Sequence, residues 1–134
     1  DIGDGAYAEP EPVAEPEPVA GFDGTTIKIG VVNDFSGPAA IIGLPLQSGV
    51  ATYYEWVNDQ GGIGGKYPVE LVEADSTYNP SVAVQSYSDM KDDIAIVGNL
   101  FGTPVVTALL ESLKEDDPQH LDIIYGLLSM HIIF

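Results

Sequence analysis

A pattern of strand, loop and helix occurs three times between Thr25 and Asp117, and it constrains the fold more than any other feature of the chain. Each repeat starts with a short apolar run, continues through a loop rich in Gly, Pro, Ser or Asn, and ends with apolar residues at helical spacing. Strands that alternate with helices are typical of parallel sheets, and the crossovers between parallel strands are right-handed in nearly all cases. We therefore predict an α/β fold with an open, doubly wound, mostly parallel sheet.

The first repeat predicts a central strand over residues 27–32, because its β-branched, apolar residues suit a strand that is covered on both faces. Ser36-Gly37-Pro38 ends this strand in a turn. A helix is predicted over residues 45–58, since Pro45 is tolerated in the first turn and the glycines at 61–65 stop the helix. The predicted apolar face of this helix consists of Leu46, Val50, Tyr53, Tyr54 and Val57.

The second and third repeats predict strands over residues 69–74 and 94–98, the latter apolar throughout and hence central. Asn79-Pro80 has the residue types of an N-cap followed by the first position of a helix, and Thr103-Pro104 begins another helix. The residues predicted to face the core are Ala83, Tyr87 and Met90 in the second helix, and Val106, Leu109, Leu110 and Leu113 in the third. Three loops then follow the strands at one edge of the sheet, where α/β proteins bind ligands.

The segments that flank the repeats have a different composition. Residues 1–24 are acidic and rich in proline, with the repeat AEPEPV at 8–13 and 14–19, which predicts a disordered linker. Residues 25–117 form the folded unit of three βα repeats. Residues 118–134 form a divergent apolar tail, in which Leu121–Tyr125 is a candidate fourth strand.

Composition excludes several classes of function. The chain holds 21 acidic residues against 4 basic ones, so its net charge of −17 would repel nucleic acid. The absence of cysteine excludes disulfides and thiolate metal sites. No run approaches the roughly 20 apolar residues that span a bilayer. Because the chain starts at Asp1 without an initiator Met, we expect that a signal or anchor segment is missing from it.

No motif predicts catalysis, a cofactor or a metal. The glycine-rich stretch at 61–66 lacks the spacing of a phosphate loop and follows a helix rather than a strand. Asp34 and Asp75 end strands, but the second acid and the lysine of a phosphoryl-transfer site are not seen beside them. The serines lack a G-x-S-x-G elbow. We therefore expect a protein that is not an enzyme.

Taken in order, the motifs of residues 25–115 resemble a known family. They include IKIGVVNDFSGPAAIIG, NDQGGIGGKYPVELVEADSTYNPSVAV and IAIVGNLFGTPVVTAL. These stretches look like the N-terminal lobe of the Leu/Ile/Val-binding type of extracytoplasmic solute-binding proteins of ABC importers.

The resemblance implies a two-lobed protein that closes on an amino acid, most typically a branched-chain or other apolar one, and delivers it to a membrane permease. It implies a periplasmic or tethered cell-surface location and no chemical change of the ligand. A sensory or receptor-type ectodomain with the same fold is the alternative. The chain departs from the family after the third helix, so we expect it to bind ligand weakly or not at all by itself.

The resemblance also assigns ligand-binding residues. Gly102 and Thr103 would hold the charged end of the ligand through backbone amides and a hydroxyl, and Ile42 would contact the ligand's side chain. Phe35, Ser36 and Phe101 would line the same crevice. From the residues alone, Thr103 is equally suited to be a helix N-cap, Ile42 to be buried under its loop, and Ser36 to stabilise its turn.

Overall fold

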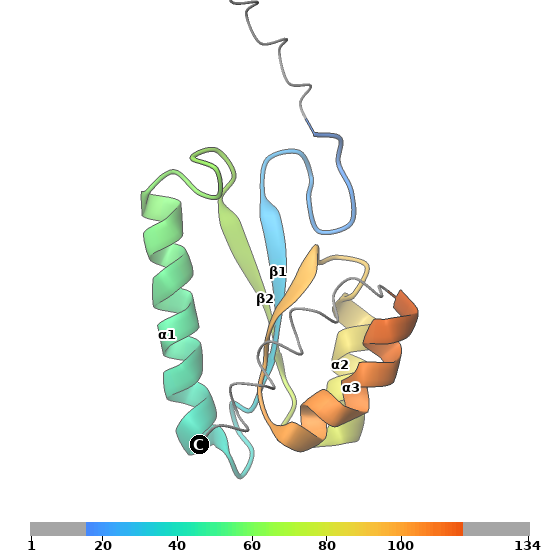
Figure 1. The fold of residues 1–134 in the computed structure, drawn as a ribbon. Coiled ribbons are helices and arrows are strands. Elements are labelled where there is room, and N and C mark those ends of the chain that lie inside the picture. Colours follow the sequence, from blue (N-terminus) through green and yellow to red (C-terminus); the bar gives the residue numbers. More distant parts are fainter. Residues whose placement is uncertain (1–15, 117–134) are drawn as a thin grey trace, which may run out of the picture.

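The computed structural model describes residues 16–116, in which strands and helices alternate along the chain (Figure 1). The elements are β1 (Ile27–Asn33), α1 (Ala40–Asp59), β2 (Val69–Asp75), α2 (Pro80–Met90), β3 (Ile96–Leu100) and α3 (Thr103–Asp116). The strand order is β2-β1-β3, and β1 is parallel to both neighbours. The predicted α/β fold with a parallel sheet and a central first strand is confirmed.

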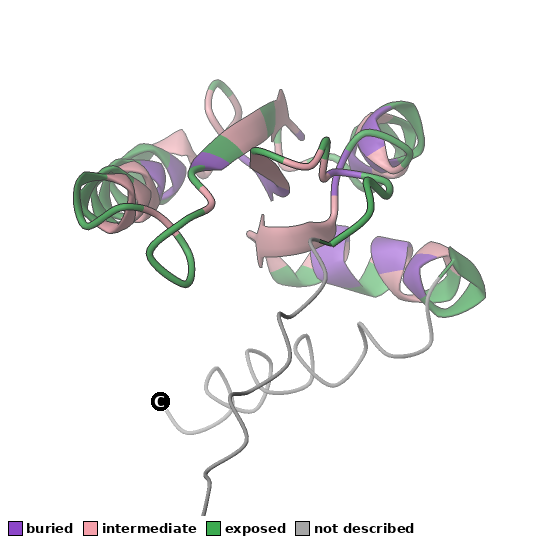
Figure 2. Ribbon diagram, turned by 90° about the horizontal axis from the view of Figure 1, so that it is seen from above, coloured by how far each residue is buried: buried purple, intermediate pink, exposed green. Residues whose placement is uncertain are grey.

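Helices cover both faces of the sheet, with α1 on one face and α2 and α3 on the other (Figure 2). The main core lies between the sheet and the α2–α3 pair. Its buried members are Val32, Ala83, Tyr87, Met90, Ile94, Val105, Val106, Leu109 and Leu113. Leu110 packs against this cluster while partly exposed. The core faces predicted for α2 and α3 are therefore confirmed, with Val105 as an additional buried residue.

The α1 face is covered less completely than its sequence predicts. Only Gly43 and Gln47 of α1 are buried, whereas Leu46 is 40% and Tyr53 56% exposed. The prediction of a buried apolar face was thus wrong for Leu46 and Tyr53. On their side of the helix, an open groove of about 440 Å³ separates α1 from β3, lined by Pro45, Leu46, Gly49, Val50, Tyr53, Tyr54 and Gly98.

Helix α1 begins at Ala40, five residues before the predicted start, so Pro45 lies inside the helix instead of at its first position. The first turn forms earlier because Ile42 N and Gly43 N both donate to the carbonyl of Ala39. Helix α2 begins as predicted. The Asn79 side chain accepts hydrogen bonds from Ser81 N and Val82 N, and Pro80 occupies the first turn.

Strand β3 lies two residues further along the chain than predicted. Ile94 is buried but precedes the strand, where Ala95 N donates to Lys28 O over 2.8 Å. All five residues of β3 are half-buried, and within residues 16–116 it pairs only with β1. The expectation that β3 is a central strand is therefore not met in this part of the chain. The prediction rested on the apolar sequence of the strand, and an apolar sequence does not specify how many strands flank it.

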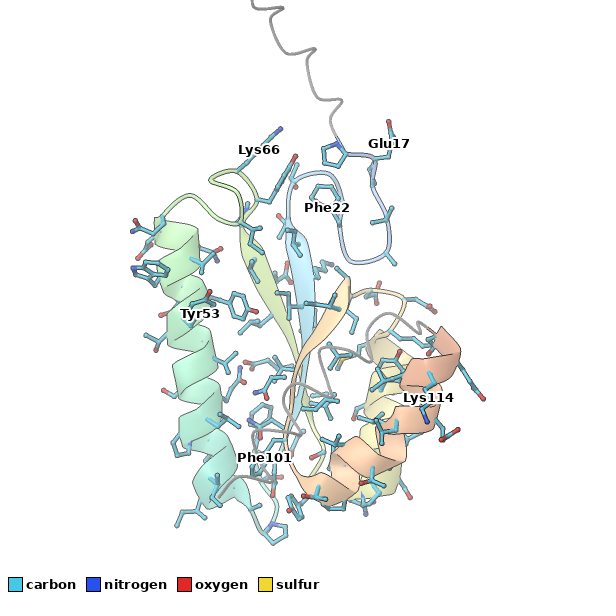
Figure 3. The ribbon with its side chains drawn as sticks, viewed as in Figure 1. Glu17, Phe22, Tyr53, Lys66, Phe101 and Lys114 are labelled. Carbon is cyan, nitrogen blue, oxygen red and sulfur yellow. The ribbon has the colours of Figure 1, made fainter. Side chains whose placement is uncertain are left out.

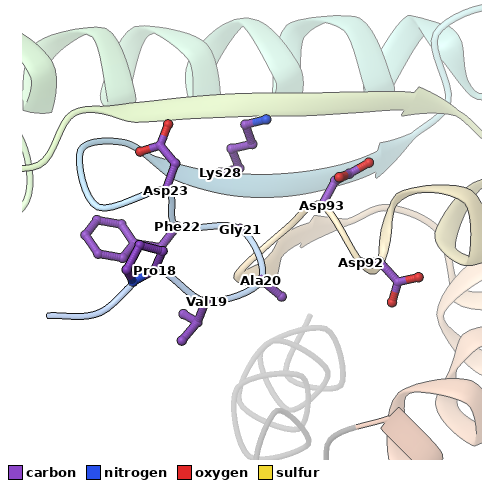
Figure 4. A pocket seen from close by; sticks show the side chains of 9 residues that line it. All are labelled: Pro18, Val19, Ala20, Gly21, Phe22, Asp23, Lys28, Asp92 and Asp93. Carbon is purple, nitrogen blue, oxygen red and sulfur yellow. The ribbon is translucent and has the colours of Figure 1, made fainter.

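Residues 18–23, which the sequence assigns to the linker, contact the start of the sheet. Val19 and Phe22 exchange two backbone hydrogen bonds of 2.9 Å, and Lys28 N donates to Gly21 O over 2.7 Å. The Phe22 ring meets the Tyr67 ring edge-on at 5.1 Å. A cavity of about 360 Å³ lies beside this segment and is lined by Pro18, Val19, Ala20, Gly21, Phe22, Asp23, Lys28, Asp92 and Asp93 (Figure 4).

The remaining expectations about the flanking segments fall outside the described residues. These are the disorder of residues 1–15 and the candidate fourth strand at Leu121–Tyr125. Among residues 16–116, no helix has the length and apolar character that crossing a membrane requires.

Candidate functional site

The loops that follow the three strands gather at one edge of the sheet, where β1, β2 and β3 all end. They comprise residues 34–39, 76–79 and 101–102. Figure 3 shows Phe101 at this edge, with Phe22 and Lys66 at the opposite end of the molecule. Because ligands of open α/β sheets bind beyond the carboxyl ends of the strands, this edge is the candidate site.

A buried polar network ties the ends of β1 and β2 to the start of α1. Asn33, Asp34 and Ser76 are all 0% exposed. The Asn33 amide donates to Gly43 O over 2.9 Å and its oxygen accepts Asp34 N over 2.7 Å. The backbone N–H and the hydroxyl of Ser76 both donate to Asn33 O, over 2.7 and 3.0 Å. Satisfied buried polar groups of this kind hold the surrounding backbone in one arrangement.

The carboxylate of Asp34 organises the turn after β1. Its oxygens accept Gly37 N over 2.5 Å and Ala39 N over 2.7 Å. These bonds orient the chain so that α1 starts directly after the Ser36-Gly37-Pro38 turn, which explains the early start of the helix. Asp34 is therefore engaged with backbone amides and has a structural role at the site.

Asp75 joins the first loop to the second. One of its oxygens accepts Phe35 N over 3.0 Å and Thr77 N over 2.9 Å, and the other accepts the Ser36 hydroxyl over 2.5 Å. Partial burial raises the pKa of the Asp75 carboxyl, but these hydrogen bonds outweigh it, so the pKa lies below the ordinary value of 3.8. The Ser36 hydroxyl thus stabilises its turn. This is the role that the residue type alone suggests for Ser36, whereas the family resemblance suggests that it lines the crevice.

This arrangement predicts an acid-dependent contribution of Asp75 to stability. Because the folded-state pKa is lowered, the carboxylate stabilises the fold above pH 3.8, and this contribution disappears as the pH falls through the lowered pKa. The free energy of unfolding of Asp75→Asn should therefore lie below that of the wild type at neutral pH and converge with it in acid. Urea denaturation at a series of pH values measures this gap. A gap that stays constant down to pH 2 contradicts the assignment.

Tyr78 links the second loop to the third. Thr77 and Tyr78 have positive φ angles of 49° and 59°, a conformation that residues other than glycine adopt rarely. Tyr78 N donates to the Ser76 hydroxyl over 3.2 Å, and the Tyr78 and Phe101 rings lie 6.0 Å apart. The Tyr78 ring also lies so close to Gly102 that a β-carbon there would be 2.5 Å from Cε2. No sequence signal marks this pair of strained residues.

The third loop delivers the start of α3. The Gly102 carbonyl accepts Val106 N over 2.9 Å, so Gly102 has the N-cap position and Thr103 is the first helical residue. The interpretation of Thr103 as N-cap is thereby wrong, because the helix starts one residue earlier than an N-cap at Thr103 requires. Thr103 is exposed, and its hydroxyl makes no hydrogen bond with any residue in 16–116.

The structure brings five of the six predicted site residues onto the linked loops or the start of α3: Phe35, Ser36, Phe101, Gly102 and Thr103. Ile42 lies in the first turn of α1 and is 59% exposed, so it is not buried under its loop. Sequence reasoning missed the supporting roles of Asn33, Ser76 and Tyr78. In the described residues, no group of His, Cys, Asp or Glu is arranged to hold a metal ion.

The parallel sheet, with its linked loops and helix starts at one edge, forms an α/β lobe of the kind in which ligands bind beyond the carboxyl ends of the strands. Residues 26–118 match the periplasmic binding protein family, and the chain belongs to this family. None of the curated proteins matches the chain in sequence.

Solved structures of this kind resemble the chain. A fatty acid ABC transporter substrate-binding protein from Thermomonospora curvata is 30% identical with a TM-score of 0.70, over 75% of this chain. A periplasmic binding protein type 1 from Bordetella pertussis Tohama I is 33% identical with a TM-score of 0.60, over 68% of this chain. A substrate-binding periplasmic protein from Ralstonia solanacearum is 29% identical with a TM-score of 0.56, over 65%. In each case the chain covers 25% of the other protein's length.

Proposed function

We propose that the chain serves as the N-terminal lobe of a solute-binding component of an ABC importer. It would act outside the cytoplasm, in the periplasm or tethered at the cell surface, and pass its ligand unchanged to a membrane permease. The proposed ligand is a small solute with a carboxylate and an apolar part, with branched-chain and other apolar amino acids first. The start of α3 carries this proposal, because the exposed Thr103 hydroxyl there adjoins Gly102 and has no hydrogen-bond partner among residues 16–116.

A carboxylate at this edge would have to be held by backbone amides and hydroxyls, because no basic side chain of residues 16–116 lies there. All four basic residues lie away from it: Lys28 at the start of β1, Lys66 before β2, Lys91 after α2 and Lys114 in the last turn of α3. The helices α1, α2 and α3 all begin at the candidate edge, and a helix start carries partial positive charge. The first-turn N–H groups of α1 donate to Ala39 O and those of α2 to the Asn79 side chain, which leaves the start of α3 as the candidate for a ligand. In a chain with a net charge of −17, backbone amides are therefore the groups here that favour an anion.

The residues around the start of α3 suit an apolar ligand part. Ile42 is 59% exposed, and Phe35 and Phe101 are half-buried. The relative from Thermomonospora curvata is named for fatty acids, which also combine a carboxylate with an apolar chain. Apolar amino acids and fatty acids both have a carboxylate joined to an apolar part. The titration described below compares the binding of the two classes.

Substituting Thr103 tests this proposal against a matched control. Thr103→Val keeps the shape of the side chain but removes the hydroxyl, so we expect about a tenfold weaker affinity for the carboxylate ligand, the effect of losing one hydrogen bond to a charged group. Thr107 lies one turn further along α3 and is also exposed, and its hydroxyl donates to Thr103 O over 2.8 Å. Thr107→Val should leave the affinity unchanged.

The protein is titrated separately with leucine, isoleucine, valine, leucinamide and a short fatty acid. NMR of the backbone amides measures the binding of each compound. Binding of the acids but not of the amide supports capture of a carboxylate by α3. Equal binding of leucine and leucinamide, or equal losses in both threonine variants, contradicts it.

The affinity of this chain by itself is expected to be low. A site with one wall cannot bury most of a ligand's surface, whereas small-molecule sites usually enclose 70–90% of it. We expect a dissociation constant on the order of millimolar, equivalent to about 4 kcal/mol. Micromolar binding by this chain, measured by calorimetry, would show that the single lobe is sufficient.

A further inference from the structure

The start of α3 offers a ligand only two backbone amides. Pro104 is the second residue of the helix and has no N–H, and Val105 is 0% exposed. Val106 N already donates to Gly102 O over 2.9 Å. Gly102 and Thr103 therefore supply the backbone amides that a ligand at this helix start can reach.

Both amides depend on the backbone conformation of Gly102. The Gly102 amide belongs to the planar peptide group before its α-carbon, and the Thr103 amide belongs to the planar peptide group after it. The two dihedral angles at this α-carbon therefore set the relative orientation of the two N–H groups. Gly102 has a φ of 101°, which glycine adopts readily but does not favour over other conformations. A neighbouring group is needed to hold the two amides in one orientation.

The ring of Tyr78 lies against the α-carbon of Gly102. A β-carbon added to Gly102 would lie 2.5 Å from Cε2 and 3.1 Å from Cδ2 of Tyr78, so the ring fills the space on that side. The Tyr78 ring also lies 6.0 Å from the Phe101 ring, with an angle of 53° between the ring planes. It thus packs against both residues of the loop between β3 and α3.

The backbone of Tyr78 is itself held by the loops around it. Thr77 N donates to the Asp75 carboxylate over 2.9 Å, and Tyr78 N donates to the Ser76 hydroxyl over 3.2 Å. The Thr77 carbonyl oxygen also lies close to Gly37, where an added β-carbon would be 2.5 Å from it. Rare backbone conformations such as those of Thr77 and Tyr78 persist where surrounding contacts impose them, and they cluster at functional sites.

We propose that Tyr78 is a positioning residue for the carboxylate of the ligand. Its ring holds the conformation of Gly102, and so fixes the relative orientation of the Gly102 and Thr103 amides before the ligand binds. This role rests on the function proposed above and adds a residue to it. Groups that are ordered before binding lose less conformational entropy, which raises the affinity. The Tyr78 hydroxyl makes no hydrogen bond with any residue in 16–116, so the role belongs to the ring.

Removing the ring tests the proposal in the complete 134-residue chain. In ¹⁵N relaxation without ligand, Tyr78→Ala should lower the order parameters of Gly102 and Thr103 from about 0.85 towards about 0.6. In a titration with valine, Tyr78→Ala should bind about tenfold more weakly, because the ligand must then order the helix start itself. Tyr78→Phe keeps the ring and should retain the wild-type values of both. Tyr53→Ala is the matched control and should change neither, since the Tyr53 ring also contacts an aromatic ring, that of Tyr54 at 5.2 Å, but lines the groove beside β3.

A double-mutant cycle separates positioning from general support of the fold. In the Tyr78→Ala background, Thr103→Val should weaken valine binding by only about threefold rather than about tenfold, because a mobile helix start makes less use of the hydroxyl. An undiminished effect of Thr103→Val, unchanged order parameters in Tyr78→Ala, or equal affinities of Tyr78→Ala and the wild type overturn the positioning role and leave the proposed function intact. If the wild type binds no acid of the panel, both the proposed function and this role are contradicted.

Discussion

Replacing Gly43 with alanine should destabilise the protein by about 3 kcal/mol or more, because the added β-carbon collides with backbone that cannot move aside. The position of this carbon would be 2.0 Å from Asp34 O and 2.9 Å from Asn33 Oδ1. Gly43 O also accepts the Asn33 side-chain amide, so a shift of α1 would break the buried network beneath the site. Urea denaturation followed by far-UV circular dichroism measures the loss.

Gly49→Ala is the control for this substitution, since it lies in the same helix and its β-carbon would meet nothing within 4 Å. Alanine is the better helix former, so Gly49→Ala should stabilise the protein by up to about 1 kcal/mol. Equal effects of the two substitutions would contradict the close approach of α1 to the end of β1.

Replacing Asp34 with alanine should cost about 2–4 kcal/mol, because it leaves two backbone donors without their acceptor in a site that is closed to water. The donors are Gly37 N and Ala39 N, and Asp34 itself is 0% exposed. Asp34→Asn keeps one acceptor oxygen and should lose less. The same denaturation measurement quantifies both variants.

Asp59→Ala is the control for Asp34→Ala, because Asp59 is an exposed residue at the end of α1. Removing an acid near a helix C-terminus is neutral or slightly favourable, so Asp59→Ala should change the free energy of unfolding by no more than about 0.5 kcal/mol. If Asp34→Ala is equally mild, the turn after β1 does not depend on its carboxylate.

Sequence reasoning predicted the elements well where local signals agree with the tertiary fold. The β-branched run of β1, the Asn79-Pro80 start of α2 and the apolar spacing of α3 each carry their own structural information. It failed where a distant group decides the outcome. The early start of α1 depends on the buried carboxylate of Asp34, and Leu46 and Tyr53 are exposed because they line an open groove between α1 and β3.

The candidate site shows the same division. The motif positions Ser36, Asp75 and Gly102 could be found from the sequence, because turns and helix starts have residue preferences. The contacts that link them could not, since Tyr78 meets Phe101 and Gly102 only after the loops after β2 and β3 come together. The positive φ angles of Thr77 and Tyr78 oppose the local preference of both residues and are held by tertiary contacts.

The measurement that tests the central claim most directly is an NMR titration of the backbone amides with leucine, up to its solubility limit. Binding at the candidate edge predicts shifts that are confined to the loop at 34–39, the loop at 76–79 and the start of α3 at 101–105. These shifts should be absent with leucinamide and weakened in Thr103→Val. If no acid of the panel shifts these amides, or if the shifts centre on the groove of Tyr53 and Gly98, the edge does not form the carboxylate site.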